Sequence, residues 1–254
     1  MKTKEPQDLW HNPEYVAGLF DRMAATYGVL NYITSFGFSE RWRKECVHLL
    51  GIPSPTSQTR GITAKGPEDE VVYDLMTGMG EAWPSLTSAG ISRIVSVDLS
   101  PGMCGRAREN AKRYNADIEV LQKDVMTLVD SGQADYVVCC FGLKTLSDSD
   151  RTSLAQKTRE LLKPGGRFAF VEISAARSWW LGFLYRFYLR RVIPLLGRLF
   201  GGDALAYGML GKYTESFGDC RQFAEELQNE GLSAQYRSLF FGCASTVSGS
   251  KPED

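Results

Sequence analysis

The chain has 254 residues, which is enough for one α/β domain with a complete core and additional helices. Its hydrophobic fraction of 43% and charged fraction of 23% are typical of an ordinary soluble globular protein. The 29 basic and 30 acidic side chains leave a net charge of −1, so charge gives no indication of a nucleic-acid partner.

The six cysteines are scattered, without a C-x-x-C pair or a Cys/His cluster, which favours reduced thiols and predicts no metal site. Residues 1–8 lack the apolar core of a secretory signal, and no run of roughly 18 uncharged apolar residues could span a membrane. These absences predict a cytoplasmic protein.

The N-terminal region has helical periodicity over residues 12–50, interrupted over residues 31–37. Apolar residues at Val16, Leu19, Phe20 and Met23 have the spacing of one helix face. Residues 54–70 are rich in Ser, Thr, Pro and Gly and predict a flexible loop. Residues 1–70 are therefore expected to form a helical cap and a loop, ahead of the main domain of residues 71–254.

From residue 71 onward, short valine-rich runs alternate with helix-like stretches, as expected for parallel strands covered on both faces. The predicted strands are residues 71–75, 93–98, 118–122, 136–141 and 167–173. The clearest predicted helices are residues 103–115, 150–162 and 219–230, the second of which ends at Lys163-Pro-Gly-Gly166. Two last runs, 234–240 and 243–248, predict an antiparallel hairpin at the sheet edge. The pattern predicts a Rossmann-like, seven-stranded, mostly parallel sheet with helices on both faces.

The segment of residues 71–81, Val-Val-Tyr-Asp-Leu-Met-Thr-Gly-Met-Gly-Glu, leads from a buried strand through a glycine turn into a helix. Gly78 and Gly80 have no Cβ, so the backbone there can approach a ligand closely. A dinucleotide fingerprint would have a third glycine where this chain has Trp83. Alone, the segment favours a plain strand-to-helix turn.

Acidic residues at or after the ends of the next two predicted strands favour a ligand-binding glycine turn over a plain one. Asp98 ends the second strand, where a carboxylate can accept hydrogen bonds from both hydroxyls of a ribose. Asp124 follows the third strand, where its carboxylate and the neighbouring amide can read an adenine edge. Together with Asp135 and the Lys-Pro-Gly-Gly turn, in this order, they predict an adenosine-binding site.

These motifs resemble those of the class I methyltransferases and, more narrowly, the C-methyltransferases of ubiquinone and menaquinone biosynthesis. The resemblance extends from about Val16 to Lys251. Its narrower part rests on Leu19-Phe-Asp-Arg-Met-Ala-Ala-Thr-Tyr27, Asn31-Tyr-Ile-Thr-Ser-Phe-Gly37, Arg41-Trp42-Arg43, and Phe141-Gly-Leu143 with Asp148. It implies methyl transfer from S-adenosyl-L-methionine to a ring carbon of a polyprenylated quinol.

The expected cofactor site combines the glycine turn with residues that the resemblance implies. Its members are Tyr27, Asp74, Gly78, Gly80, Asp98, Leu99, Asp124, Val125, Cys140 and Phe141. No metal is expected.

The chain departs from the family pattern at several positions. Met76, Thr77 and Met79 replace small residues of the family's Asp-Leu-Ala-Gly-Gly-Thr-Gly-Asp. Ser39 stands where the family has histidine, Lys144-Thr145 replaces Arg-Asn, and Glu172-Ile-Ser-Ala-Ala replaces Glu-Phe-Ser-Lys-Pro. These changes favour a divergent member that methylates a small aromatic, quinol or enol-like acceptor on carbon.

Two other functions remain open. One is a protein of this fold that has lost methyl transfer and catalyses a rearrangement or cyclisation. The other is a non-enzymatic subunit of a biosynthetic complex.

Methylation of carbon requires removal of a proton from the acceptor, so a general base is expected. His11 and His48 are the only histidines, and His48 is expected to be a structural or surface residue. Lys144, after the fourth predicted strand, and Glu172, at the end of the fifth, are the catalytic candidates. Taken alone, each residue is more often non-catalytic, with Lys144 a solvated loop lysine.

Residues 178–200 are aromatic and basic, and three interpretations remain open for them. They could form part of a helical lid, at about residues 177–215, over a hydrophobic or aromatic substrate. They could contact a membrane surface peripherally. They could also pack in the core or form a homodimer surface. The family resemblance favours the lid.

Overall fold

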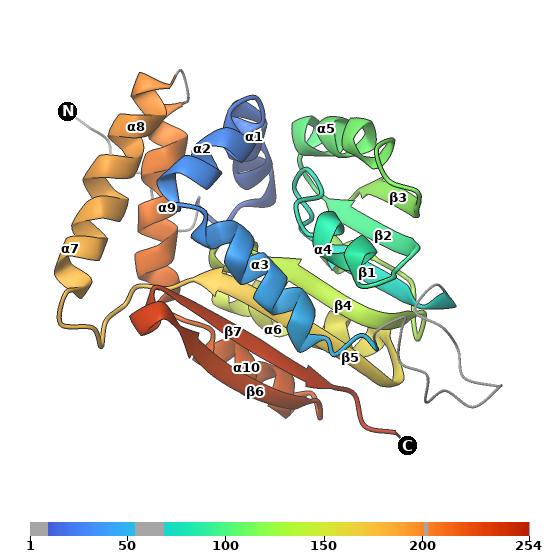
Figure 1. Ribbon diagram of the computed structural model, residues 1–254. Coiled ribbons are helices and arrows are strands. Elements are labelled where there is room, and N and C mark those ends of the chain that lie inside the picture. Colours follow the sequence, from blue (N-terminus) through green and yellow to red (C-terminus); the bar gives the residue numbers. More distant parts are fainter. Residues whose placement is uncertain (1–9, 54–68, 201–202, 254) are drawn as a thin grey trace.

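A computed structural model describes residues 10–53, 69–200 and 203–253, and a twisted seven-stranded sheet runs through it (Figure 1). The strand order is β3-β2-β1-β4-β5-β7-β6. The strands are β1 (Val71–Leu75), β2 (Arg93–Asp98), β3 (Asp117–Gln122), β4 (Ala134–Cys140), β5 (Leu162–Ile173), β6 (Ser233–Leu239) and β7 (Ala244–Ser250). β1 to β5 are parallel, whereas β7 is antiparallel to both β5 and β6. This arrangement confirms the predicted sheet and its C-terminal hairpin.

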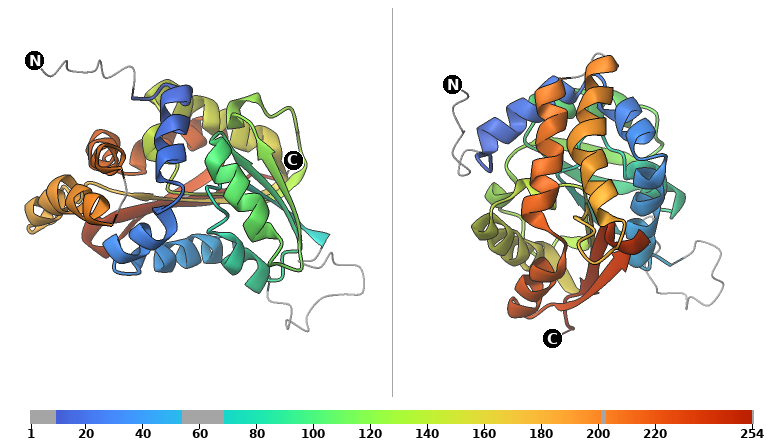
Figure 2. Two further views of the ribbon diagram at one scale, coloured as in Figure 1. Left: turned by 90° about the horizontal axis from the view of Figure 1, so that it is seen from above. Right: turned by 90° about the vertical axis from the view of Figure 1, so that its left-hand side faces the viewer.

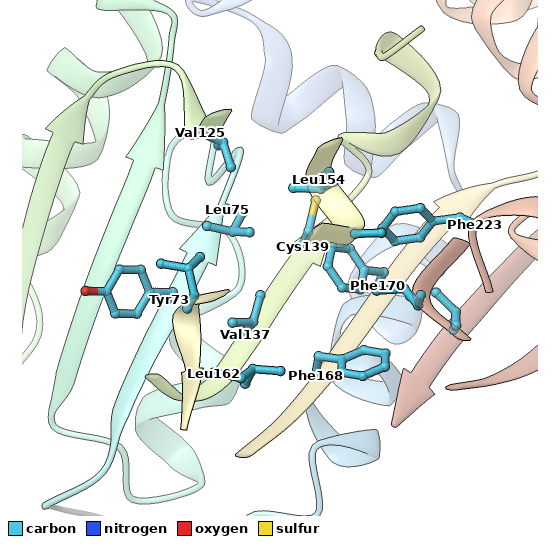
Figure 3. Close-up of a cluster of buried hydrophobic side chains, with 14 of the residues drawn as sticks. Tyr73, Leu75, Val125, Val137, Cys139, Leu154, Leu162, Phe168, Phe170 and Phe223 are labelled. Atoms are coloured by element: carbon cyan, nitrogen blue, oxygen red, sulfur yellow. The ribbon is translucent and has the colours of Figure 1, made fainter. Parts of the chain in front are cut away.

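Helices cover both faces of the sheet because its parallel strands are apolar on both sides. One face packs against α3 (Phe38–Leu49), α4 (Trp83–Ser88) and α5 (Pro101–Ala111). The other packs against α6 (Asp148–Leu161) and α10 (Arg221–Asn229). Figure 3 shows this second core, in which Phe170 of β5 packs against Phe223 of α10 and against Phe168, and Leu154 of α6 lies near Cys139.

The structure corrects one predicted boundary in the sheet. α6 ends at Leu161, as the sequence predicts. The following Lys163-Pro-Gly-Gly166 lies within β5 and is not a separate turn, since Leu162 already pairs with Ala134 of β4. A register shift between Ala134 and Tyr136 accommodates the irregular segment.

A layer of helices lies beyond the carboxyl ends of the parallel strands (Figures 1 and 2). It consists of α1 (Pro13–Met23), α2 (Tyr27–Thr34), α7 (Gly182–Phe187), a π-helical turn (Tyr188–Val192), α8 (Ile193–Leu199) and α9 (Ala204–Phe217). Leu19, Met23 and Leu30 of the first two helices bury against Tyr207 and Tyr213 of α9. Residues far apart in the sequence thus share a third small core.

The predicted interruption of the N-terminal helices over residues 31–37 is partly wrong. α2 continues to Thr34, and the break that follows ends at Gly37, whose φ of 76° suits glycine. Nearly all of the predicted loop over residues 54–70 lies outside the described residues. Among the described helices, none is long and apolar enough to cross a membrane.

Candidate active site

A cleft lies at the carboxyl ends of β1, β2 and β4 under α1 and α2. Its volume is about 1000 Å³, including the part of its mouth that is open to solvent. Most of the predicted cofactor residues line it, namely Tyr27, Gly78, Asp98, Leu99, Asp124, Val125, Cys140 and Phe141. This position is where open α/β sheets bind their ligands. We refer to it as the first cleft.

Asp98 is anchored at the end of β2 by backbone N–H groups from two turns. Its Oδ2 accepts a hydrogen bond from the Gly78 N–H at 2.8 Å, and its Oδ1 accepts one from the Ser100 N–H at 2.9 Å. Burial raises the pKa of this carboxyl to about 6, while the two backbone bonds act in the opposite direction. Each carboxylate oxygen has a further lone pair, so the group can still accept the hydroxyls of a ribose.

Asp74 and Gly80 do not line the first cleft but shape the turn beneath it. Asp74 is buried and accepts a hydrogen bond from the Thr77 hydroxyl, and burial raises its pKa to about 7. A Cβ on Gly80, which has a φ of 86°, would lie 2.3 Å from the buried Trp83 ring. The sequence predicted a cofactor-binding role for both residues, and that role stays a prediction.

Asp124 caps the short 3-10 turn η3 (Val125–Thr127) after β3, where its Oδ1 accepts the Met126 N–H at 2.9 Å. The cap holds the carboxylate and the following residue, Val125, against the same cleft wall. The contact with an adenine edge remains a prediction.

Glu81 is a cleft residue to which the sequence assigned no role. Its Oε2 accepts the Met79 N–H at 3.0 Å, but its buried Oε1 has no hydrogen-bond partner among the described residues. A buried carboxylate oxygen normally has a partner, so this oxygen suits a cationic or N–H group of a bound ligand, such as an ammonium. Glu81 is the last residue of the glycine-containing segment 71–81, and this position was the sequence signal that could have identified it.

His11 and Asp21 bond the N-terminal cap to the turns around the first cleft, and His11 also lines the cleft itself. The carbonyl oxygen of Thr145 accepts a hydrogen bond from His11 Nδ1 at 2.9 Å, which leaves Nε2 as the ring's acceptor. Asp21 Oδ1 accepts both the Ser100 hydroxyl and the Gly102 N–H, and so ties α1 to the turn that follows Asp98. The sequence carried no signal for these contacts, because the partners are separated by about 80 or more residues. His48, on α3, is exposed, as the sequence predicted.

A second cleft adjoins the first and shares Tyr27 and Phe141 with it. Its volume is about 1350 Å³, including the part of its mouth that is open to solvent. Its lining is mostly aromatic and aliphatic and comes from α2, α3, the α7–α9 helices and the turn between β6 and β7. Trp42, Trp179 and Tyr185 are among its large side chains. Such a cavity fits an apolar ligand with an aromatic ring.

Lys144 and Glu172, the two catalytic candidates, form an ion pair at this junction. The Lys144 Nζ lies 2.8 Å from Glu172 Oε1, and the two side chains are only 4% and 0% exposed. Lys144 Nζ also donates to the Phe141 carbonyl at 2.9 Å. Lys144 lines the second cleft, whereas Glu172 lines neither cleft and bonds to two residues that line the second, Lys144 and Ile173.

Comparison with known proteins places these clefts in context. The profile of the ubiE/COQ5 methyltransferase family matches residues 9–251. The chain is 30% identical to a demethylmenaquinone methyltransferase of Thermus thermophilus, over 92% of this chain and 100% of the relative. It is also 30% identical to a ubiquinone/menaquinone biosynthesis C-methyltransferase UbiE of Syntrophotalea carbinolica, over 91% of this chain and 92% of the relative.

Solved structures of low sequence identity share the fold. A Haemonchus contortus phosphoethanolamine N-methyltransferase 2, solved with S-adenosyl-L-methionine, superposes with a TM-score of 0.53 at 14% identity. That match covers 72% of this chain and 49% of the other. The Rossmann-like methyltransferase fold is therefore common to both proteins.

The two glycines of the turn offer a test of which one faces the ligand. We expect Gly80→Ala to lower the free energy of unfolding by about 2–4 kcal/mol, because the added Cβ meets Trp83 in a left-handed backbone conformation. Gly78→Ala meets only the flexible end of Glu81, so it should cost about 1 kcal/mol yet weaken binding of the expected cofactor. Thermal unfolding and titration calorimetry measure the two effects. Equal losses of stability in the two variants would contradict the assignment.

The raised pKa of Asp98 predicts a pH dependence of cofactor binding. The ionised carboxylate accepts the ribose hydroxyls, so affinity for S-adenosylmethionine should fall about tenfold per pH unit below about 6. Asp98→Asn should weaken binding at pH 7.5 by roughly 1.5–3 kcal/mol and remove most of this dependence. The exposed Asp117→Asn serves as the control with the same chemical change. A pH profile that persists in Asp98→Asn would assign the titration to another group, such as Asp74.

Proposed function

The chain belongs to the ubiE/COQ5 methyltransferase family and is an S-adenosylmethionine-dependent methyltransferase, and we propose that it methylates a ring carbon of a quinol with an apolar tail. The observation that carries this proposal is the meeting of two clefts of opposite character at Tyr27 and Phe141. The first offers carboxylates to a cationic, hydroxylated ligand, and the second offers aromatic side chains to a hydrophobic one. The names of the similar enzymes support a quinol acceptor.

Residues of the first cleft fit the parts of S-adenosylmethionine. Asp98 suits the ribose hydroxyls, and Asp124 with Val125 suits the adenine edge. The Glu81 oxygen, which has no hydrogen-bond partner among the described residues, suits the ammonium of the methionine part. When bound, the cofactor supplies an electrophilic methyl group that an acceptor carbon takes by in-line displacement. The chain's contribution is to hold two ligands in line and to exclude water at the junction.

Lys144 is placed to act on an acceptor oxygen in the second cleft. A ring carbon becomes nucleophilic when a neighbouring hydroxyl loses its proton, and the resulting negative charge on oxygen needs a nearby cation. The Lys144 ammonium lines this cleft in a buried environment, where such stabilisation is strong. Glu172 holds the ammonium in position, so we assign it a positioning role.

His11 is a candidate for carrying the proton away. Its Nδ1–H is held by the Thr145 carbonyl, so its Nε2 is available as an acceptor at the wall of the first cleft. The α7–α9 helices, which line the second cleft, are proposed to form the lid over the acceptor.

The acceptor is tested directly with a reduced demethylmenaquinone that carries a short prenyl tail. We expect one equivalent of S-adenosylhomocysteine and a product heavier by one CH2, with the new methyl on a ring carbon by nuclear magnetic resonance. Methylation on oxygen, or turnover only with non-quinol aromatic acceptors, would contradict the proposed acceptor. An isomerised product without S-adenosylhomocysteine would indicate a rearrangement instead.

Substitution of Lys144 tests the proposed charge stabilisation. We expect the double variant Lys144→Gln/Glu172→Gln, which leaves no unpaired buried charge, to lower kcat by about 10²–10³-fold. Affinity for S-adenosylmethionine should change little, because neither side chain lines the first cleft. Lys144→Arg, which keeps the charge and has the residue of the family pattern, is expected to retain most activity. An unchanged kcat in the folded double variant would remove Lys144 from the mechanism.

A further inference from the structure

Positive charge is concentrated in the outer helices of the lid. Residues 173–202 contain no aspartate or glutamate, although the whole chain has a net charge of −1. Their basic residues are Arg177, Arg186, Arg190, Arg191 and Arg198. Arg190 pairs with Glu215, whereas Arg186, Arg191 and Arg198 form no ion pair with any described residue. This part of the surface therefore carries uncompensated positive charge.

The same helices expose large apolar side chains. Trp180, in the turn before α7, is 78% exposed, and Phe183 and Phe187 of α7 are 59% and 60% exposed. Leu195, Leu199 and Phe200, on and just after α8, are also exposed. Figure 2 shows α7 and α8 as the outermost helices of the molecule, with α9 beside them. An apolar patch of this kind marks an interaction site and exceeds the scattered exposed residues of an ordinary surface.

Exposed aromatic residues also surround the opening of the second cleft. Phe36, Leu184 and Phe240 line that cleft, yet they are 78%, 51% and 48% exposed, so they lie at its mouth. The neighbouring Phe241 is 65% exposed and stacks on Trp179 with ring centroids 5.4 Å apart. The apolar surface of α7 is thus continuous with the mouth of the proposed acceptor cleft.

The backbone at this mouth adopts conformations that L-residues rarely take. Phe36, Phe240 and Phe241 have φ values of 51°, 42° and 56°. Such non-glycine residues in the left-handed region are unfavourable and cluster at functional sites. Here they present three aromatic rings to the solvent beside the cleft, which a purely structural turn does not require.

We define a docking face by the residues Trp180, Phe183, Phe187, Arg186, Arg191 and Arg198. We propose that this docking face binds the surface of a bilayer containing anionic lipids, so that an acceptor with an apolar tail enters the second cleft directly from the membrane. Aromatic side chains favour the interfacial region, and arginines extend their charged ends to lipid phosphates. The entry of the acceptor rests on the proposed function, whereas the binding of the bilayer rests on the surface alone.

A second copy of the chain is a poorer occupant for this face. A two-fold interface brings the same patch of both copies together. The arginines would then oppose arginines, because the segment has no acidic side chain to pair with them. Anionic lipid headgroups supply the missing negative charge.

Vesicle binding tests the docking face without cofactor or acceptor. We expect the full chain to sediment with vesicles of equal parts phosphatidylcholine and phosphatidylglycerol, weakly with phosphatidylcholine alone, and less as salt increases. Arg186→Gln/Arg191→Gln/Arg198→Gln should weaken binding by about a hundredfold, at roughly fivefold per arginine. The control Arg93→Gln/Arg106→Gln/Arg159→Gln removes the same charge from exposed positions on other elements and should bind like the unaltered chain.

The apolar contribution is tested by Trp180→Ser/Phe183→Ser/Phe187→Ser, which should also release the protein from vesicles. Equal binding by both arginine triples, or no binding by the unaltered chain, would overturn the proposal. A dimer by sedimentation velocity that becomes monomeric in the serine variant, with no vesicle binding, would do so as well. Turnover by the docking-face variants separates this proposal from the proposed function. We expect these variants to lose turnover of an acceptor embedded in vesicles and to retain turnover of a short-tailed soluble acceptor.

Discussion

The buried ion pair between Lys144 and Glu172 holds the junction of the two clefts together. Neither charge reaches solvent appreciably, so each requires the other, and removal of one partner would cost about 3–5 kcal/mol. The same ammonium binds the carbonyl of Phe141, whose φ of 70° is unusual for a bulky residue. The pair thereby anchors the backbone of Phe141, a residue that lines both clefts.

The two clefts differ in what their walls leave unsatisfied. In the first, Asp98 retains acceptor capacity after binding two backbone N–H groups, and Glu81 retains a buried oxygen that has no partner within the part of the chain that the structure describes. In the second, aromatic surface is the main feature, and Lys144 is its one charged lining residue among those described. A polar, cationic ligand and a hydrophobic one are thus directed to opposite sides of one aromatic wall.

The helices beyond the carboxyl ends of the parallel strands connect the junction of the two clefts to the molecular surface. α1 is bonded through Asp21 to the turn after β2, and α9 buries its tyrosines against α1 and α2. α7 and α8 then lie outside α9, and the docking face is formed by Trp180, just before α7, and by side chains of α7, the π-helical turn and α8. From the first cleft to the docking face, the charged groups change from buried carboxylates to arginines. The cationic cofactor and the anionic lipid surface therefore each meet groups of opposite charge.

The sequence by itself determined the sheet, the order of its elements and the positions of Asp98, Asp124 and Gly78, because these depend on local periodicity and on residues that follow strands directly. Only the tertiary structure decided that Gly80 packs against Trp83 and that Lys144 pairs with Glu172. It likewise decided that His11 bonds to Thr145 and that Asp21 bonds to the turn after β2. These contacts join residues whose separation in the chain leaves no periodic signal. Their energies depend on burial and on three-dimensional distance, which the order of residues does not encode locally.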